Sequence, residues 1–210
     1  MKITFPSQCE EYINLQCNGD KSLYEDFPEH KYIHGYLKDM QPDNVLDIGA
    51  GLGRASVWLF KKYGWERTHF VFLDGDTGKK QFEGIRKEKG EYYNDWRMGV
   101  HFCDSNGLLD VDYEQPEDVP LFEMFDNKFD LIYSFLAVGF HWPMDMYLDD
   151  LYPLCSKGTL LIFGLRGTEK KAWVEGQIER IDKEKYKVLK FIHKPTQTRE
   201  SVLVLCPVNL

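Results

Sequence analysis

The sequence has no long apolar run. Nowhere in its 210 residues are there the roughly 20 consecutive apolar residues that a membrane-spanning helix needs. Residues 1–11, which read MKITFPSQCEE, lack the apolar core of a secretory signal peptide. We therefore expect a cytoplasmic protein that makes no contact with a membrane.

The chain also lacks the cysteine patterns of disulfide-rich domains and zinc sites. Its five cysteines are scattered, odd in number and without a Cys-x-x-Cys pair: Cys9, Cys17, Cys103, Cys155 and Cys206. Reduced thiols are expected, without a disulfide framework. His30 and His34 would share one face of a helix, but no third ligand lies near them in the sequence, so no bound metal is expected.

Basic residues are outnumbered by acidic ones. There are 26 lysines and arginines against 34 acidic residues, giving a net charge of −8. Proteins that bind a phosphate backbone usually carry a basic face, because the release of counterions drives their affinity. The one dense basic stretch, residues 183–194, is interleaved with apolar residues, and we interpret it as a solvated face. A nucleic-acid partner is therefore not expected.

The most informative stretch is residues 45–54, VLDIGAGLGR, which combines an apolar strand, an acid, a glycine-rich turn and the start of a helix. Glycines let a ligand approach the backbone closely, and the N–H groups of the new helix face the same place. A dinucleotide fingerprint needs a third Gly or Ala where this chain has Arg54, and the Gly-Lys-Ser/Thr of a Walker loop is absent. An acid at the tip of the first strand, Asp47, suits a cationic amine better than a pyrophosphate.

The pattern Asp47-x-Gly49-x-Gly51-x-Gly53 resembles the first motif of the class I S-adenosylmethionine-dependent methyltransferases at all four defining positions. In that family the turn passes under the methionine part of the cofactor. The resemblance covers roughly residues 43–206. It implies an α/β fold with a seven-stranded, mostly parallel sheet in the order 3-2-1-4-5-7-6, helices on both faces and a C-terminal antiparallel hairpin. It also implies S-adenosylmethionine as the cofactor and S-adenosylhomocysteine as the product.

Asp74 follows directly on the apolar run of residues 69–73. In nucleoside-binding α/β folds, an acid at the tip of the second strand accepts hydrogen bonds from ribose hydroxyls. We expect further strands over residues 99–105 and 129–134. The resemblance then adds three cofactor-binding side chains at the ends of these strands: Asp104, Ser105 and Ser134.

The segment after the fourth expected strand carries the candidates for the acceptor side. It begins Ser-Phe-Leu-Ala at residues 134–137, where the nucleobase amino-methyltransferases have Asn/Asp/Ser-Pro-Pro-Tyr/Phe, which argues against methylation of DNA bases. His141 is the candidate general base, and Trp142 is expected to border the substrate. Arg166, just past the fifth strand, is a candidate for binding a carboxylate or phosphate on the substrate.

Residues 1–42 precede the first core strand, and we expect them to form an N-terminal helical cap on a cofactor-binding domain of residues 43–210. Two interpretations stay open: a lid over the active site, as is common in the resembling family, or a helix that only covers the sheet. Residues 107–128 are strongly acidic and are interpreted as a solvated surface connection.

The sequence thus predicts an S-adenosylmethionine-dependent methyltransferase that is a monomer or homodimer and acts on the oxygen or nitrogen of a small molecule. Two alternatives remain. One is a protein that uses the same cofactor for other chemistry, such as aminopropyl transfer or a lyase reaction, or that only binds it. The other is a NAD-dependent reductase, which Asp47 and Arg54 disfavour.

Overall fold

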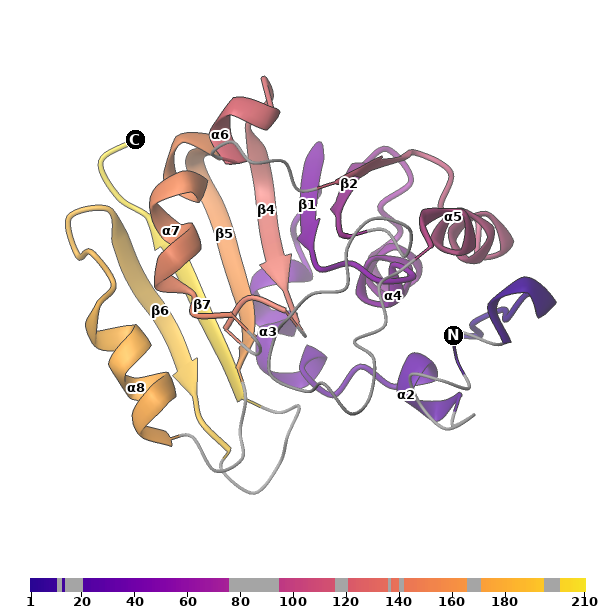
Figure 1. Ribbon diagram of the computed structural model, residues 1–210, viewed down its shortest axis with the longest axis horizontal. Helices are drawn as coiled ribbons and strands as arrows, with labels where there is room; N and C mark the ends of the chain where they lie inside the picture. The colour runs from indigo at the N-terminus through magenta and orange to yellow at the C-terminus, as the bar shows by residue number, and fades with distance from the viewer. Residues whose placement is uncertain are drawn as a thin grey trace.

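The computed structural model describes residues 1–10, 13, 21–75, 95–115, 121–135, 137–139, 142–165, 171–194 and 201–210. Within them, seven strands form one sheet in the order β3-β2-β1-β4-β5-β7-β6, as the resemblance implies. Figure 1 shows the part of this order that runs from β2 through β1, β4, β5 and β7 to β6. The strands are β1 (Asn44–Ile48), β2 (His69–Leu73), β3 (Val111–Glu114), β4 (Phe129–Ser134), β5 (Cys155–Leu165), β6 (Tyr186–Ile192) and β7 (Ser201–Pro207).

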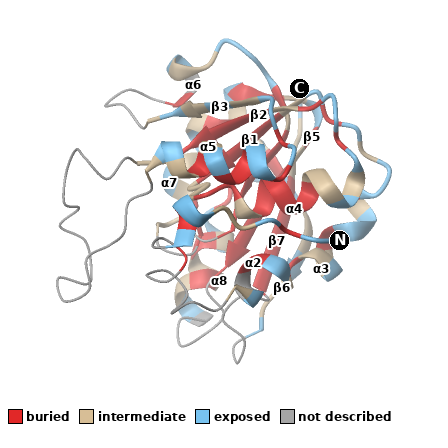
Figure 2. Cartoon of the chain, turned by 90° about the vertical axis from the view of Figure 1, so that its right-hand side faces the viewer, coloured by how far each residue is buried: buried red, intermediate tan, exposed pale blue. Residues whose placement is uncertain are grey.

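Strands β1 to β5 run parallel to one another, and β7 runs antiparallel to both β5 and β6. β1 lies between β2 and β4, with Leu46 opposite both Val71 and Ile132. The inner strands are nearly continuous apolar runs because the sheet is covered on both faces, and Figure 2 shows them as the buried interior of the molecule. The carboxyl ends of β1, β2, β3, β4 and β5 therefore meet at one edge.

Helices cover both faces of the sheet. One face packs against α3 (His30–Leu37), α4 (Arg54–Tyr63) and α5 (Trp96–Ser105). The other packs against α7 (Asp145–Leu151) and α8 (Lys171–Glu179). Shorter helical turns complete the described part: η1 (Ser7–Cys9), α2 (Ser22–Glu25), α6 (Leu121–Met124) and η2 (Tyr152–Leu154). No helix in these parts of the chain is both long and apolar enough to cross a membrane.

The prediction of a strand over residues 99–105 is wrong, because this segment belongs to helix α5. Asp95 begins the helix as its N-cap, and its carboxylate accepts a hydrogen bond of 3.0 Å from the Arg97 N–H. The buried residues Gly99, Phe102 and Cys103 then recur at helical spacing.

The third strand is β3, which lies inside the acidic stretch of residues 107–128 that we expected to be a solvated connection. Its side chains alternate between half-buried and exposed, as on an edge strand, so it shows no apolar run. The same stretch also contains α6. The expectation of a plain surface loop is therefore wrong.

The N-terminal segment packs on the face that carries α4. Buried side chains of η1, α2 and α3 join the core cluster of that face. From α3, Tyr36 donates a hydrogen bond to the Leu189 carbonyl at 3.4 Å, and Lys190 of β6 donates to the Tyr32 carbonyl at 2.9 Å. The helix therefore bridges α4 and the hairpin strand β6.

Candidate functional site

The glycine turn lies at the carboxyl end of β1 and is held against β2, because the Gly49 N–H donates to the Leu73 carbonyl at 2.7 Å. Gly49, Gly51 and Gly53 all adopt positive φ angles, of 73°, 59° and 79°. Residues with a side chain adopt this left-handed conformation only at a cost. The turn therefore requires glycine at each of these positions.

Two of these glycines also allow close packing. A Cβ on Gly49 would lie 2.3 Å from the Ala137 Cβ in the segment after β4, and a Cβ on Gly53 would lie 2.4 Å from the Phe72 ring. The missing side chains let the segment after β4 approach the turn and let α4 begin directly against β2. The turn is thus the point at which β1, β2 and β4 converge.

Asp74 closes the turn from the side of β2. One carboxylate oxygen accepts the Gly51 N–H at 2.5 Å, and the other accepts the Gly75 N–H at 2.7 Å. Burial raises the pKa of this carboxyl group, and the two N–H donors oppose the rise. Because a carboxylate oxygen accepts more than one hydrogen bond, each oxygen keeps capacity for a ligand hydroxyl.

Asp47 is the penultimate residue of β1, and only 3% of it is exposed. The Ser56 hydroxyl on α4 donates to its Oδ2 at 2.6 Å, and Ser56 Oγ lies 2.5 Å from the Tyr133 hydroxyl on β4. Burial raises the Asp47 pKa to about 7, and the negative charge of Asp74 adds to the rise. Hydrogen bonds from Ser56 and Tyr133 and the positive charge of Arg54 act in the opposite direction.

A cavity of about 400 Å³ opens beside Asp74. It is lined by residues that follow β2, by the first turns of α5 and by β3: Asp74, Gly75, Trp96, Val100, Val111, Asp112, Tyr113, Glu114 and Gln115. The backbone ties its walls together, because the Asp74 N–H donates to the Glu114 carbonyl at 3.1 Å. Sequence reasoning missed Trp96 and the β3 residues. Residues 111–114 alternate between apolar and acidic side chains and end on the acid Glu114, and this pattern was the sequence signal for a strand here.

Ser134 ends β4 and is fully buried, and its hydroxyl accepts the Val138 N–H at 2.9 Å. Two backbone hydrogen bonds follow in the same segment. The Gly139 N–H donates to the Trp142 carbonyl at 2.7 Å, and the Trp142 N–H donates to the Ala137 carbonyl at 3.1 Å. Ser134 therefore shapes the segment beside the glycine turn. Trp142 is half-buried at the end of that segment.

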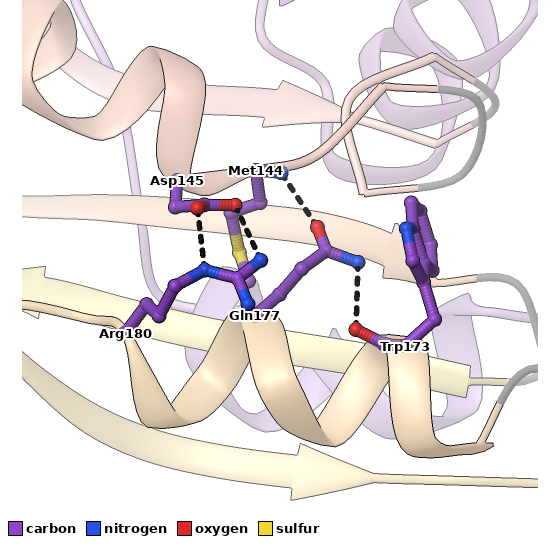
Figure 3. Close-up of polar contacts among 5 residues, drawn as sticks. All are labelled: Met144, Asp145, Trp173, Gln177 and Arg180. Carbon is purple, nitrogen blue, oxygen red and sulfur yellow. Dashed lines mark hydrogen bonds and ion pairs between the residues drawn. The ribbon is translucent and has the colours of Figure 1, made fainter.

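Helix α8 holds the same segment from the other side (Figure 3). The fully buried Gln177 accepts the Met144 N–H at 2.6 Å and donates to the Trp173 carbonyl at 3.5 Å. Next to it, Arg180 donates two hydrogen bonds to Asp145, at 2.6 and 3.2 Å. The chain after β4 is thus fixed by Ser134 at its start and by α8 where α7 begins.

The N-terminal segment reaches this edge at Asp26 and Phe27. The Phe27 ring is buried and packs edge-on against Phe135, with ring centroids 4.7 Å apart. The Arg54 guanidinium lies 5.3 Å from the centre of the Phe27 ring and donates to the Asp26 carbonyl at 3.2 Å. Residues 26–27 therefore contact the start of α4 and the end of β4.

The expected histidine pair lies on α3, away from this edge. His30 and His34 both lie within hydrogen-bonding distance of the Tyr63 hydroxyl, at 2.8 and 3.0 Å. Burial lowers the His30 pKa to about 4, with His34 and Lys62 adding to the effect. Among the described residues, no group of three or more metal-ligating side chains is placed to hold a metal ion.

The structure does not bring all the candidate residues together. Asp47, Gly49, Gly51, Gly53, Asp74 and Ser134 converge at one edge. Asp104 and Ser105 lie exposed on the last turn of α5, which leads to the amino end of β3 and so away from that edge. The prediction that Asp104 and Ser105 lie at the tip of a strand is wrong, because the segment is helical. His141 and Arg166 lie outside the described residues.

Comparison with known proteins identifies the fold. No family model matches the sequence, and no curated protein does. Among solved structures, one similar to this chain is the O-methyltransferase TomG from Streptomyces achromogenes in complex with S-adenosylmethionine, which is 10% identical in sequence and has a TM-score of 0.58. The match covers 99% of this chain and 92% of TomG. A putative rRNA methylase from Clostridium thermocellum is 14% identical in sequence and has a TM-score of 0.57. The match covers 86% of this chain and 96% of the methylase.

A ribosomal protein L11 methylase from Lactobacillus delbrueckii subsp. bulgaricus is 15% identical, with a TM-score of 0.51 over 78% of this chain and 69% of its own. The fold is therefore that of the class I S-adenosylmethionine-dependent methyltransferases, as the resemblance implied. The expectation that nucleic acid is not a partner is overturned, because proteins with this fold include rRNA and ribosomal protein methylases. Net charge does not decide the acceptor class.

Gly49→Ala tests the close approach at the turn, and Gly64→Ala is its matched control. Gly64 ends α4 with a φ of 67°, and a Cβ there would meet no atom within 4 Å. We expect Gly64→Ala to lower the free energy of unfolding by about 1 kcal/mol through backbone strain. Gly49→Ala should cost roughly 1–3 kcal/mol more, because its Cβ also collides with Ala137. Equal losses in urea denaturation would contradict the packing described for the turn.

Asp47→Asn tests the buried acid. A carboxyl with a raised pKa keeps its proton in the folded state while the unfolded chain ionises, so the contribution of Asp47 to stability falls as pH rises from about 4 to about 7. The loss is about 1.4 kcal/mol for each pH unit. The advantage of Asp47→Asn over wild type should therefore grow across this range and then level off. Asp39→Asn, at an exposed surface acid, controls for the lost charge. A constant difference between wild type and Asp47→Asn would contradict the assignment.

Proposed function

We propose that the protein is an S-adenosylmethionine-dependent methyltransferase. The observation that carries the proposal is a pair of acids, the buried Asp47 and the half-buried Asp74, on either side of a turn of three left-handed glycines at the carboxyl ends of β1 and β2. The bound cofactor would supply an electrophilic methyl group with its own leaving group. The protein then needs only to hold an acceptor in line with that group and to exclude water.

The described residues match the parts of this cofactor. The carboxyl group of Asp47 is buried among hydroxyl donors and suits the cofactor's ammonium group. Asp74 keeps acceptor capacity for the ribose hydroxyls. The glycine turn leaves space over its backbone for the methionine part. The cavity next to Asp74, with Trp96 and Tyr113 in its wall, suits the adenine ring.

For the acceptor we propose a small molecule, methylated on oxygen or nitrogen. In the segment after β4, Ala137 lies beside the glycine turn, Ser134 and Gln177 accept the N–H groups of Val138 and Met144, and we propose that Trp142 borders the acceptor. We propose that Arg166 contacts the acceptor and that residues 1–42 cap the site. The contacts of Phe27 with Phe135 and Arg54 support this position for the cap.

Ligand-induced stabilisation tests the cofactor. S-adenosylhomocysteine and S-adenosylmethionine, each at about 100 times its Kd, should stabilise the protein by about 2.7 kcal/mol, which raises Tm by roughly 5–10 °C. NAD should have no effect. Asp74→Ala should abolish the shift, whereas Asp110→Ala, which removes an acid bound to His69 at the amino end of β2, should preserve it. A shift with NAD alone would contradict the proposal.

Transfer of a radiolabelled methyl group then tests the reaction and its acceptor. Label should enter a low-molecular-weight extract, and total RNA and total protein from the same cells are assayed beside it. Label in RNA or protein alone would overturn the small-molecule acceptor and retain the methyltransferase. In aminopropyl transfer or a lyase reaction the labelled methyl group stays on sulfur and leaves as 5′-methylthioadenosine, so label recovered only in that product would instead indicate one of these reactions.

We also propose His141 as the general base. His141→Gln should lower turnover at least tenfold, because a deprotonating group is lost, and should leave the affinity for S-adenosylhomocysteine nearly unchanged. His101→Gln, on the exposed face of α5, serves as the control. Unchanged turnover of His141→Gln across the pH profile would exclude His141 as the base.

A further inference from the structure

Three buried side chains from three elements form a continuous chain that ends at the proposed cofactor site. They are Asp47 of β1, Ser56 of α4 and Tyr133 of β4, with exposed fractions of 3%, 0% and 0%. Ser56 Oγ lies 2.6 Å from Asp47 Oδ2 and 2.5 Å from the Tyr133 hydroxyl. We call these three residues the hydroxyl chain.

The donor and acceptor roles in the hydroxyl chain follow from the number of hydrogens that each group carries. The Ser56 hydroxyl has a single hydrogen and gives it to the Asp47 carboxylate. Next to an ionised Asp47, Ser56 Oγ can then only accept at its other contact, and the single hydrogen of the Tyr133 hydroxyl goes to Ser56 Oγ or to the carboxylate itself. Burial raises the pKa of Tyr133 well above its usual value, so the phenol keeps its proton. Both hydroxyls therefore point their hydrogens toward the carboxylate, an arrangement that favours its ionised form.

The other groups around Asp47 leave its charge finely balanced. Arg54, at the start of α4, favours the ionised carboxylate, and Asp74, after β2, disfavours it. The negative charge of Asp47 also contributes to raising the pKa values of Cys103 of α5 and Tyr113 of β3. Burial raises the pKa of both, that of Cys103 to about 12, so neither carries charge at neutral pH. Against the cost of burial, the hydrogen bond from Ser56 is the largest influence that lowers the Asp47 pKa, followed by the charge of Arg54 and the hydrogen bond from Tyr133.

We propose that Ser56 and Tyr133 are positioning residues that hold Asp47 ionised for the cofactor's ammonium group and thereby set the pH range in which the cofactor binds. This inference rests on the proposed function, because it requires that Asp47 faces that ammonium group. Protonated Asp47 has no charge to offer, so affinity falls as the carboxyl takes up a proton below about pH 7. For one proton, the loss is about tenfold for each pH unit.

Calorimetric titrations of the whole protein with two ligands test the inference. S-adenosylhomocysteine carries the ammonium group, and 5′-methylthioadenosine has the same nucleoside and sulfur but no amino-acid part. From about pH 5.5 to 8.5, wild type should lose affinity for S-adenosylhomocysteine about tenfold per pH unit below its midpoint. Affinity for 5′-methylthioadenosine should stay nearly constant, because that ligand makes no contact with Asp47.

Tyr133→Phe and Ser56→Ala each remove a donor from the hydroxyl chain, so each should move the midpoint upward by about one pH unit. Near pH 7 they should bind S-adenosylhomocysteine several-fold to tenfold more weakly, with recovery at high pH. Tyr186→Phe is the matched control: it removes a buried tyrosine hydroxyl that donates to the Leu148 carbonyl at 2.6 Å in the opposite core cluster. Its profile should match that of wild type.

A variant that folds poorly would lose affinity at every pH and for both ligands, so it is distinguishable from a shifted midpoint. A loss for Tyr133→Phe that is equal at all pH values, or an unchanged midpoint, would overturn the inference. So would a flat wild-type profile with clear binding of S-adenosylhomocysteine, which would leave the proposed function standing. Failure of wild type to bind either ligand at any pH would overturn both.

Discussion

The bond from the Gly51 N–H to the Asp74 carboxylate is the interaction on which the site depends. It ties the tip of β2 to a turn that only glycine adopts at low cost, and so sets where β1 ends and α4 begins. The absent side chains at Gly49 and Gly53 let the segment after β4 and the strand β2 pack closely on either side. One hydrogen bond and three glycines thereby bring residues from three strands and a helix to one edge of the sheet.

The same geometry carries an energetic cost. Asp47 is buried and Asp74 is half-buried, and desolvation raises the pKa of each carboxyl group. Around neutral pH the folded protein holds an acid in an environment that opposes its charge, which lowers stability. A bound cation at Asp47 and hydroxyls at Asp74 would offset that cost. Sites that bind ligands commonly trade stability for function in this way, and here the trade involves two named residues.

The sequence predicts the centre of the fold well and its edge poorly. The stretch from β1 through α4, the strand β4 and the strand order all follow from apolar runs, glycines and the resemblance. Residues 99–105 were misassigned because a short apolar run suits a strand or a helix, and the Asp95 cap decides between them. Strand β3 was hidden because an edge strand needs no apolar run. The hydroxyl chain joins positions 77 residues apart, a contact that no local pattern reveals.

The most direct test of the account is the effect of S-adenosylhomocysteine on the glycine amide signals in ¹H–¹⁵N NMR spectra. Each glycine reports on its own place in the chain, so the spectrum locates the ligand as well as detecting it. The account predicts saturable shifts at Gly49, Gly51, Gly53 and Gly75 and little change at Gly35, Gly64 and Gly158, which lie away from the proposed site. Binding that leaves the first four signals unmoved, or shifts confined to the other three, would contradict it.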